Sequence, residues 1–336
     1  MKKNLTSILL TFIFIGLFVP SESVSKNKNL IIATATTGGT YYPVGVAIGT
    51  LVSMKLAGQY GITATAINSA GSAENIQMMV NKEADLATLQ ALFGAMAYNG
   101  SGKYKEKPIK SLRSITTLWN NVEHFTLLSK HSKTGNINDL KNLHKKFSIG
   151  KRGSGTEMSG YVILKAVDIV PDKDIRLEYL GYQASANAMI DSRIIGANIP
   201  AGAPVAAISM LFAQMGKKVK ILEFTDKQIG QINKSYPIWN RYTIKAGTYP
   251  KQSQDIHTIA QPNLLAVRGD IDKETVYLIT KTIFENLSFL SNIHSATKYL
   301  DIDGAITNLP LPLHQGAIKY YREKGISIPA VLVKDE

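Results

Sequence analysis

Short apolar runs and amphipathic stretches alternate along most of the chain. The runs 30–33, 62–67 and 86–90 combine β-branched and other apolar residues, as buried strands do. Residues with helical spacing follow the first two runs, at 44–56 and 73–82. This alternation of strand and helix predicts an α/β protein with open sheets.

The same alternation continues in the second half of the chain. The expected strands are 112–117, 125–128, 147–150, 176–180, 194–199, 219–224 and 263–267. The expected helices are 136–143, 158–167, 181–191, 205–215, 270–290 and 309–324. Residues 119–121 are expected to connect two strands, and 236–249 to be irregular.

Small polar residues stand where the first three expected strands end. The turn after 30–33 reads TTGGT, and Ser72 is a plausible N-cap of the helix after 62–67. In an open α/β sheet, ligands bind beyond the carboxyl ends of the strands. Free N–H groups and the helix dipole at such a turn favour an anion. The alternative for the first turn is a Thr-capped helix start without a ligand.

A second turn of the same kind follows the strand at 147–150. It reads RGSGTE and leads into a helix, so it is expected to form the opposite side of the site. Arg152 can pair with a carboxylate through two hydrogen bonds. The alternative is an arginine that faces solvent.

The N-terminus has the pattern of an export signal. Lys2 and Lys3 precede an apolar stretch at 9–19, and small residues follow at 21–23. We expect a signal peptide over residues 1–23 and a periplasmic protein; the alternative is an uncleaved membrane anchor. The chain has no cysteine, which excludes a lipoprotein anchor, disulfides and thiol catalysis.

Charge and motif content favour a binding protein over an enzyme. The formal net charge is +13, but the basic residues are dispersed, which argues against nucleic acid and suits an anionic ligand. GxGxxG, GxxxxGK[ST] and GxSxG motifs and metal-ligand histidine spacing are all missing. We therefore expect no catalytic residue, no metal site and no cofactor. Ser154 is expected to hydrogen-bond a ligand or the backbone.

Five segments together resemble the TAXI family of solute-binding proteins. They are TTGGTYYPVG (36–45), NSAGSAENIQMM (68–79), EADLATLQ (83–90), GSGTE (153–157) and LPLHQGAIKYYRE (311–323). The resemblance implies two α/β lobes of the type II periplasmic-binding-protein fold, with hinge strands and a ligand cleft between the lobes. It implies delivery to the membrane subunits of a sodium-driven tripartite ATP-independent periplasmic (TRAP) transporter. It also implies a small carboxylate as ligand, such as glutamate, a dicarboxylate or a keto acid.

The ligand-binding residues are expected at the strand ends of both lobes. The resemblance supplies most of them, and the turn pattern adds Thr37 and Arg152. The full set is Thr37, Gly38, Gly39, Thr40, Tyr41, Ser69, Ser72, Gln90, Arg152, Ser154, Gly155, Thr156, Ala201 and Gly202. Three segments depart from the family pattern, at 119–121, 151–152 and 199–201. These departures affect the expected identity of the ligand more than the expected fold.

The expected organisation is a monomer with two lobes and a hinge. Lobe I takes 24–121 and 268–336, lobe II takes 131–258, and the hinge strands are 122–130 and 259–267. The mechanism we expect is hinge closure around the anion. Two alternatives stay open. One is an exported enzyme that uses Ser154 or Tyr41. The other is a sensor or surface binding protein without a transporter.

Overall fold

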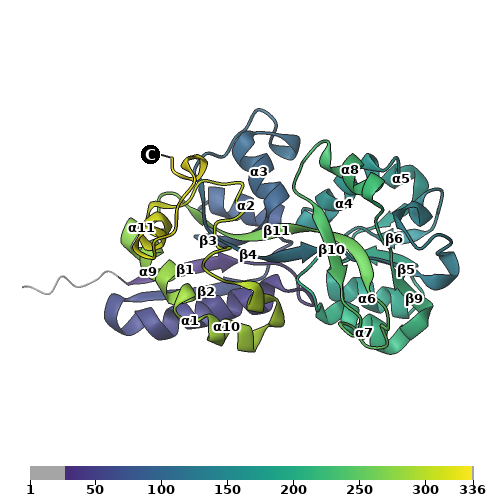
Figure 1. Cartoon of the computed structure of the whole chain (residues 1–336), viewed down its shortest axis with the longest axis horizontal. Coiled ribbons are helices and arrows are strands. Elements are labelled where there is room, and N and C mark those ends of the chain that lie inside the picture. The colour runs from purple at the N-terminus through teal and green to yellow at the C-terminus, as the bar shows by residue number, and fades with distance from the viewer. Residues whose placement is uncertain (1–26, 335–336) are drawn as a thin grey trace, which may run out of the picture.

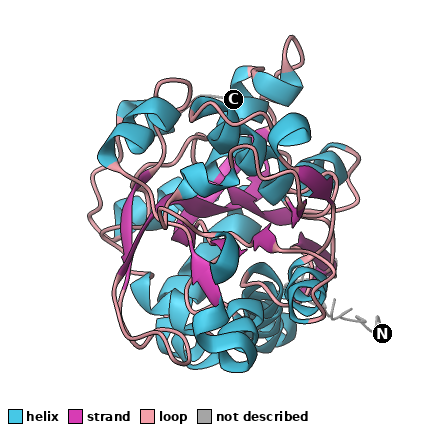
Figure 2. Ribbon diagram, turned by 90° about the vertical axis from the view of Figure 1, so that its right-hand side faces the viewer, coloured by secondary structure: helices cyan, strands magenta, loops and turns pink. Residues whose placement is uncertain are grey.

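The computed structural model describes residues 27–334, so the expected signal peptide lies outside the described residues. The described chain forms two α/β lobes that lie side by side, each built around one sheet (Figure 1). Seen from the end, helices flank the strands on both sides (Figure 2). None of the described helices is long and apolar enough to cross a membrane.

A six-stranded sheet in the order β10-β11-β3-β1-β2, with β4 also paired to β11, forms the centre of the first lobe. Its edge strand β10 extends the sheet into the second lobe, where Ile244 packs in a second-lobe cluster. β1 is parallel to β2 and β3, whereas β11 is antiparallel to β3 and β4. The strands are β1 (Lys28–Ala33), β2 (Ile62–Ile67), β3 (Leu86–Gln90), β4 (Leu112–Val122), β10 (Asn240–Ile244) and β11 (Ile256–Arg268). The helices are α1 (Tyr41–Tyr60), α2 (Ser72–Val80), α3 (Ala91–Asn99), α9 (Lys273–Phe284), α10 (Leu287–Ile293) and α11 (Gln315–Glu323).

The second lobe contains a five-stranded sheet in the order β7-β6-β8-β5-β9. Its strands are β5 (Phe125–Leu128), β6 (Lys146–Ser148), β7 (Arg176–Glu178), β8 (Gly196–Asn198) and β9 (Val219–Ile221). Its helices are α4 (Gly155–Ala166), α5 (Pro171–Asp174), α6 (Tyr182–Ile190), α7 (Ala206–Met215) and α8 (Asp226–Asn233). Two buried apolar clusters lie in the first lobe, whereas another joins Leu92 and Met96 of α3 to second-lobe residues such as Phe125.

Two stretches of chain connect the lobes. β4 leads from the first sheet directly into β5 of the second. β11 lies between β3 and β4 at one end and pairs with β10 at the other. Glu123, between β4 and β5, donates its N–H to the Ile259 carbonyl of β11 at 2.9 Å, so the two connections run together. The expected two-lobed α/β fold is confirmed.

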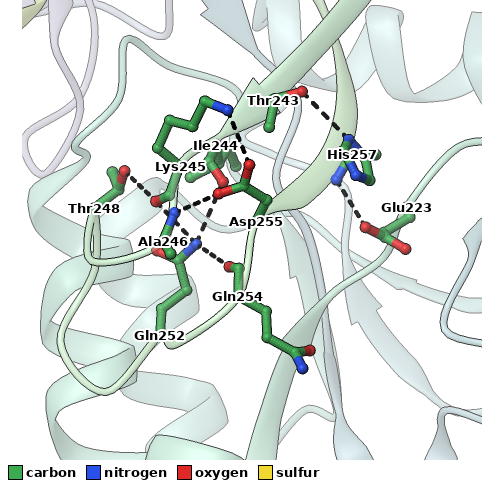
Figure 3. A network of polar contacts seen from close by, with 10 residues as sticks. All are labelled: Glu223, Thr243, Ile244, Lys245, Ala246, Thr248, Gln252, Gln254, Asp255 and His257. Carbon is green, nitrogen blue, oxygen red and sulfur yellow. Dashed lines mark hydrogen bonds and ion pairs between the residues drawn. The ribbon is translucent and has the colours of Figure 1, made fainter.

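Polar contacts hold the long loop between β10 and β11 (Figure 3). Asp255 accepts from the Ala246 N–H at 2.8 Å and from Lys245 Nζ at 2.9 Å. Gln252 Nε2 donates to the Gln254 carbonyl at 2.7 Å. The His257 N–H, at the start of β11, donates to the Glu223 carboxylate at 2.7 Å. The first three contacts hold the loop together, and the bond to Glu223 ties the start of β11 to the segment after β9.

The structure corrects three expectations about the connecting strands. Residues 119–121 lie inside β4 and are paired with β11, where Trp119 and Asn121 are buried. The region 236–249 contains β10, and the return strand starts at Ile256 instead of 263. Their mixture of aromatic, polar and proline residues hides the strand period, because these strands meet both lobes instead of one core and solvent.

Three expectations about helices were also wrong. The single helix expected over 270–290 is two helices, which separate at Asn286, whose side chain donates to the Thr282 carbonyl at 2.8 Å. Ser72 is the first residue of α2 and not its N-cap, because Gly71 occupies that position with φ 119°. Pro204 precedes α7 and is not in its first turn.

Candidate functional site

A cavity lies between the two lobes and is lined from both of them. Its volume is about 450 Å³ when all space between the lining atoms is counted, including the part open to solvent. The lobes lie close together here, because a Cβ added to Gly155 of the second lobe would come within 2.8 Å of the Gln90 side chain of the first. The lining residues are Ala35, Thr36, Gly39, Thr40, Tyr41, Ala70, Gly71, Ser72, Gln90, Asn121, Lys151, Ser154, Gly155, Thr156, Gly181, Tyr182, Pro200 and Ala201.

Five helices begin at this cavity. The N-cap or first residue of α1, α2, α3, α4 and α6 is among the lining residues. Each N-terminus carries N–H groups without partners inside the helix, together with the positive end of a helix dipole. The turns that precede these helices lie at the carboxyl ends of strands, which is why they meet at one edge. Their convergence makes the cavity favourable for an anion.

The first-lobe turn is held by contacts to the second lobe and to β11. Thr40 Oγ1 donates to the Gly202 carbonyl at 3.0 Å, and the Tyr41 hydroxyl donates to Asn263 Oδ1 at 2.5 Å. The Tyr41 ring also meets Trp119 edge to face. Burial raises the pKa of Tyr41 well above its usual value, so its phenol stays neutral. Tyr41 therefore lines the cavity with a neutral side chain and contributes no charge.

The second-lobe turn forms a capped helix start. Ser154 Oγ accepts from the Glu157 N–H at 3.0 Å, and Gly153 donates its N–H to the Glu157 carboxylate at 2.7 Å. The backbone of Gly155 lies against the first lobe. A Cβ on that residue would come within 2.8 Å of the Gln90 side chain and 2.9 Å of Ser72 Oγ. Only glycine allows the lobes to approach this closely at that point.

Tyr182 lines the cavity on the side of the second lobe. Its hydroxyl donates to the Pro200 carbonyl at 2.5 Å and lies 2.8 Å from Thr156 Oγ1. A Cβ on Gly39, in the first lobe, would come within 2.8 Å of the Tyr182 ring. Burial raises the pKa of Tyr182, so this residue is also neutral at physiological pH.

Lys151 is the one charged residue among those that line the cavity. Glu74 and Glu157 lie in the first turns of α2 and α4, but neither lines it, and their carboxylates accept from the Ala70 and Gly153 N–H groups. Two amide atoms, Gln90 Oε1 and Asn121 Nδ2, are buried without a hydrogen-bond partner. The site thus offers one cation, several free N–H groups and two unpaired amides. Among the described residues, no group of His, Asp or Glu is placed to hold a metal.

The structure brings most of the residues expected from the sequence to one cavity. Those that line it are Gly39, Thr40, Tyr41, Ser72, Gln90, Ser154, Gly155, Thr156 and Ala201. The turns that include Thr40 and Ser154 therefore face each other across the same cleft.

Five expected residues lie outside the lining. Gly38 and Gly202 accept hydrogen bonds across the lobes, from the Ala207 N–H at 3.2 Å and from Thr40. Ser69 is buried and accepts from the Gly71 N–H at 2.9 Å, and Thr37 is exposed. Arg152 is exposed, and its guanidinium lies 3.6 Å from the centre of the Tyr179 ring.

Sequence reasoning missed several lining residues, chiefly Asn121, Lys151, Gly181, Tyr182 and Pro200. Gly181 and Tyr182 follow a strand and begin a helix, so the strand-end rule that selected Ser72 could have selected them. Asn121 and Lys151 carried a weaker signal, as departures from the family pattern. Pro200 carried the same weak signal, because it lies in the departing segment 199–201.

The comparisons with known proteins agree with this architecture. Two α/β lobes that meet over a cleft and are joined by crossing strands define the type II periplasmic-binding-protein fold. The chain belongs to the NMT1-like family, whose sequence model matches residues 32–325.

Solved structures with similar folds share little sequence with this chain. A protein from Bordetella bronchiseptica RB50 is 14% identical, with 88% of this chain and 82% of that one covered and a TM-score of 0.51. The binding protein of an ABC phosphonate transporter from Pseudomonas aeruginosa is 12% identical (81% and 79% covered, TM-score 0.49). The periplasmic aliphatic sulphonate-binding protein SsuA from Escherichia coli is 13% identical (89% and 84% covered, TM-score 0.43). At 14% identity, the similarity to the Bordetella protein concerns the fold and not the ligand.

Proposed function

We propose that this protein is an exported solute-binding receptor that captures a small carboxylate between its lobes. The observation that carries the proposal is the convergence of five helix N-termini and Lys151 on one cavity without an acidic lining residue. Such an environment stabilises negative charge. The limited space favours a compact ligand, such as a glutamate-like amino acid, a dicarboxylate or a keto acid.

The proposed mechanism is hinge closure. Lobe I (24–121 and 268–336) and lobe II (131–258) would rotate about the segments 122–130 and 259–267. A ligand that contacts both turns, at Thr40 and Ser154, stabilises the closed state by the difference between its contacts in the two states. The glycines at 39 and 155 support the proposal, because they permit the close approach of the lobes.

The proposed partner is the membrane part of a TRAP transporter, with the receptor in the periplasm after cleavage of residues 1–23. The TAXI-like motifs support this assignment. Two of the similar structures are binding proteins for a phosphonate and an aliphatic sulphonate, and the first belongs to an ABC transporter. Genes for TRAP membrane subunits beside this gene would support the TRAP assignment, and genes for an ABC permease and ATPase would contradict it.

Binding without catalysis fits the chemistry of the site. Ser154 Oγ accepts from the Glu157 N–H, and no described histidine or carboxylate accepts a hydrogen bond from it. A serine without a base is a poor nucleophile, and the Tyr41 phenol is held neutral. The enzyme alternative predicts turnover. Mass spectrometry that recovers the bound ligand unchanged would exclude it.

Thermal melting against a panel of solutes tests the proposed ligand class. The panel contains L-glutamate, 2-oxoglutarate, succinate, methylphosphonate, methanesulfonate and uncharged sugars. We expect one or more of the carboxylates to raise the melting temperature, because a ligand that binds only the folded state stabilises it. The proposal fails if a sugar raises the melting temperature and no carboxylate does. If only methylphosphonate or methanesulfonate raises the melting temperature, the proposed ligand class changes from a carboxylate to that anion.

A further inference from the structure

A carboxyl group is buried behind the second-lobe wall of the cavity. Glu123 lies where β4 passes into β5, and it is fully buried. Its Oε2 accepts from Asn198 Nδ2 at 3.0 Å, whereas Oε1 has no hydrogen-bond partner among the described residues. Asn198 Oδ1 and the indole Nε1 of Trp239 are also buried without partners.

Four elements that line the cavity also surround this carboxyl. Asn121, near the end of β4, lines the cavity and precedes Glu123 by two residues, and Asn198 precedes the lining residue Pro200 by two. Ser159, whose hydroxyl interacts with Glu123, lies one turn beyond the cavity residues of α4. Tyr182, which lines the cavity on α6, interacts with Glu123 electrostatically.

Among residues 27–334, no cation pairs with this carboxyl. The groups around it are the Asn198 amide of β8, the Ser159 hydroxyl of α4, the Trp239 indole and the Tyr182 phenol of α6. From β11, Thr258 Oγ1 donates to the Glu123 backbone carbonyl. The adjacent His124 is neutral: its Nδ1–H donates to the Ile199 carbonyl and its Nε2 accepts from Tyr249. Burial without a countercharge raises the pKa of Glu123 to about 7, although Asn198, Trp239 and Ser159 oppose the shift.

We propose that Glu123 is a proton-binding site coupled to the anion site, so that capture of an anionic ligand is accompanied by proton uptake at Glu123. The inference rests on the proposed function, because it requires a negative ligand in the cavity. Two negative charges on either side of one weakly screened wall repel each other. The bound anion therefore favours protonated Glu123. By linkage, protonated Glu123 favours the bound anion to the same degree.

The sign of the pH dependence follows from this coupling. Below about pH 6, Glu123 is protonated in the free and the bound protein, and affinity does not depend on it. As the pH rises through 7, the free protein loses the proton and the complex retains it, so affinity falls. If the ligand raises the pKa of Glu123 by one unit, the dissociation constant is about fivefold larger at pH 8 than at pH 6, and about 0.4 proton is taken up at pH 7.

Isothermal titration calorimetry tests the inference on the mature protein, with L-glutamate and 2-oxoglutarate as probes. Their carboxylates remain ionised between pH 6 and 8. The dependence of the measured heat on the ionisation enthalpy of the buffer, at pH 7, counts the protons that bind with the ligand. We expect uptake in the wild type and in the Glu285→Gln control, an exposed lobe I glutamate that pairs with Lys324. We expect no uptake and a nearly pH-independent affinity in Glu123→Gln.

The outcomes separate this inference from the proposed function. Binding without proton uptake in the wild type, or equal uptake in Glu123→Gln, overturns the coupling and leaves the receptor function intact. Failure of both probes and of the whole solute panel overturns the function and the coupling together. If Glu123→Gln does not fold, Asn198→Ala replaces it. Loss of that hydrogen bond raises the pKa of Glu123 further, so the fall in affinity should move to higher pH.

Discussion

Lys151 and Arg152 are adjacent in sequence, but the fold gives their side chains different surroundings. Lys151 lines the cavity, whereas the Arg152 guanidinium stacks on Tyr179. Both residues are exposed, but only Lys151 lines the cavity, so it is the cation that the proposed function assigns to the ligand. The sequence pattern correctly predicted that the turn between β6 and α4 lines the cavity. It could not choose between two neighbouring cations, because that choice depends on the path of the loop between β6 and α4.

Substitution of these two cations separates their roles. We expect Lys151→Ala to weaken binding of the best carboxylate about tenfold, as loss of a hydrogen bond between charged groups does. Arg152→Ala is the matched control and is expected to change affinity less than twofold. The measurement is calorimetric titration of both variants. A larger loss of affinity in Arg152→Ala than in Lys151→Ala would show that Arg152 contacts the ligand, and it would contradict the role given to Lys151.

The raised pKa of Glu123 also predicts how the free energy of unfolding changes with pH. Its folded-state pKa of about 7 lies above the value near 4.3 expected for an unfolded chain, so the folded state binds more protons between these values. Stability is therefore lost as the pH rises through this window and stays constant above it. The loss amounts to about 3 kcal/mol by pH 8.

Glu123→Gln should remove this loss. We expect equal free energies of unfolding for wild type and variant at pH 4.5, and a variant that is more stable by about 2–3 kcal/mol at pH 8. Urea unfolding at both pH values provides the measurement. The neighbouring His124, whose pKa is lowered to about 4 by burial, destabilises both proteins equally in acid. A variant that is less stable at both pH values would show that Glu123 is needed as an ion.

At the scale of elements, glycines allow the helix N-termini of the two lobes to meet. Gly155 begins α4 and faces Ser72 and Gln90, which stand at the starts of α2 and α3. The sequence predicted β2 and β3 with their observed bounds, because β2 alternates, β3 is short and mostly apolar, and each ends at small or polar residues. β4 and β11 were predicted too short, because strands that meet both lobes follow neither pattern.

The change Gly155→Ala should hold the lobes apart. Its Cβ would lie under 3 Å from Gln90 and Ser72 in the closed state. We expect carboxylate affinity to fall tenfold or more, while the melting temperature of the free protein stays within about 2 °C of the wild type, because the lobes can separate to relieve the clash. Gly230→Ala is the control, since a Cβ there meets nothing within 4 Å. Unchanged affinity in Gly155→Ala would contradict closure at this contact.

At the scale of the whole molecule, the site exists only because two lobes assemble it. The turns at Thr40 and Ser154 are more than a hundred residues apart, and each alone is a common helix start. Motif order along the chain predicted that they share a cleft. The apposition of Gly39 with Tyr182 could not be predicted, because it depends on how the lobes are oriented by β4 and β11. The same connection carries Glu123, so the proposed proton site lies within the expected hinge segment 122–130.

The most direct test is a crystal structure of the protein purified without refolding, with the ligand that it carries. The account predicts a small anion in the cleft, with a carboxylate between the turn at Thr40–Tyr41 and the turn at Ser154–Thr156, and with Lys151 beside it. An uncharged ligand in the cleft, or an anion bound outside it while the cleft stays closed, would contradict the account.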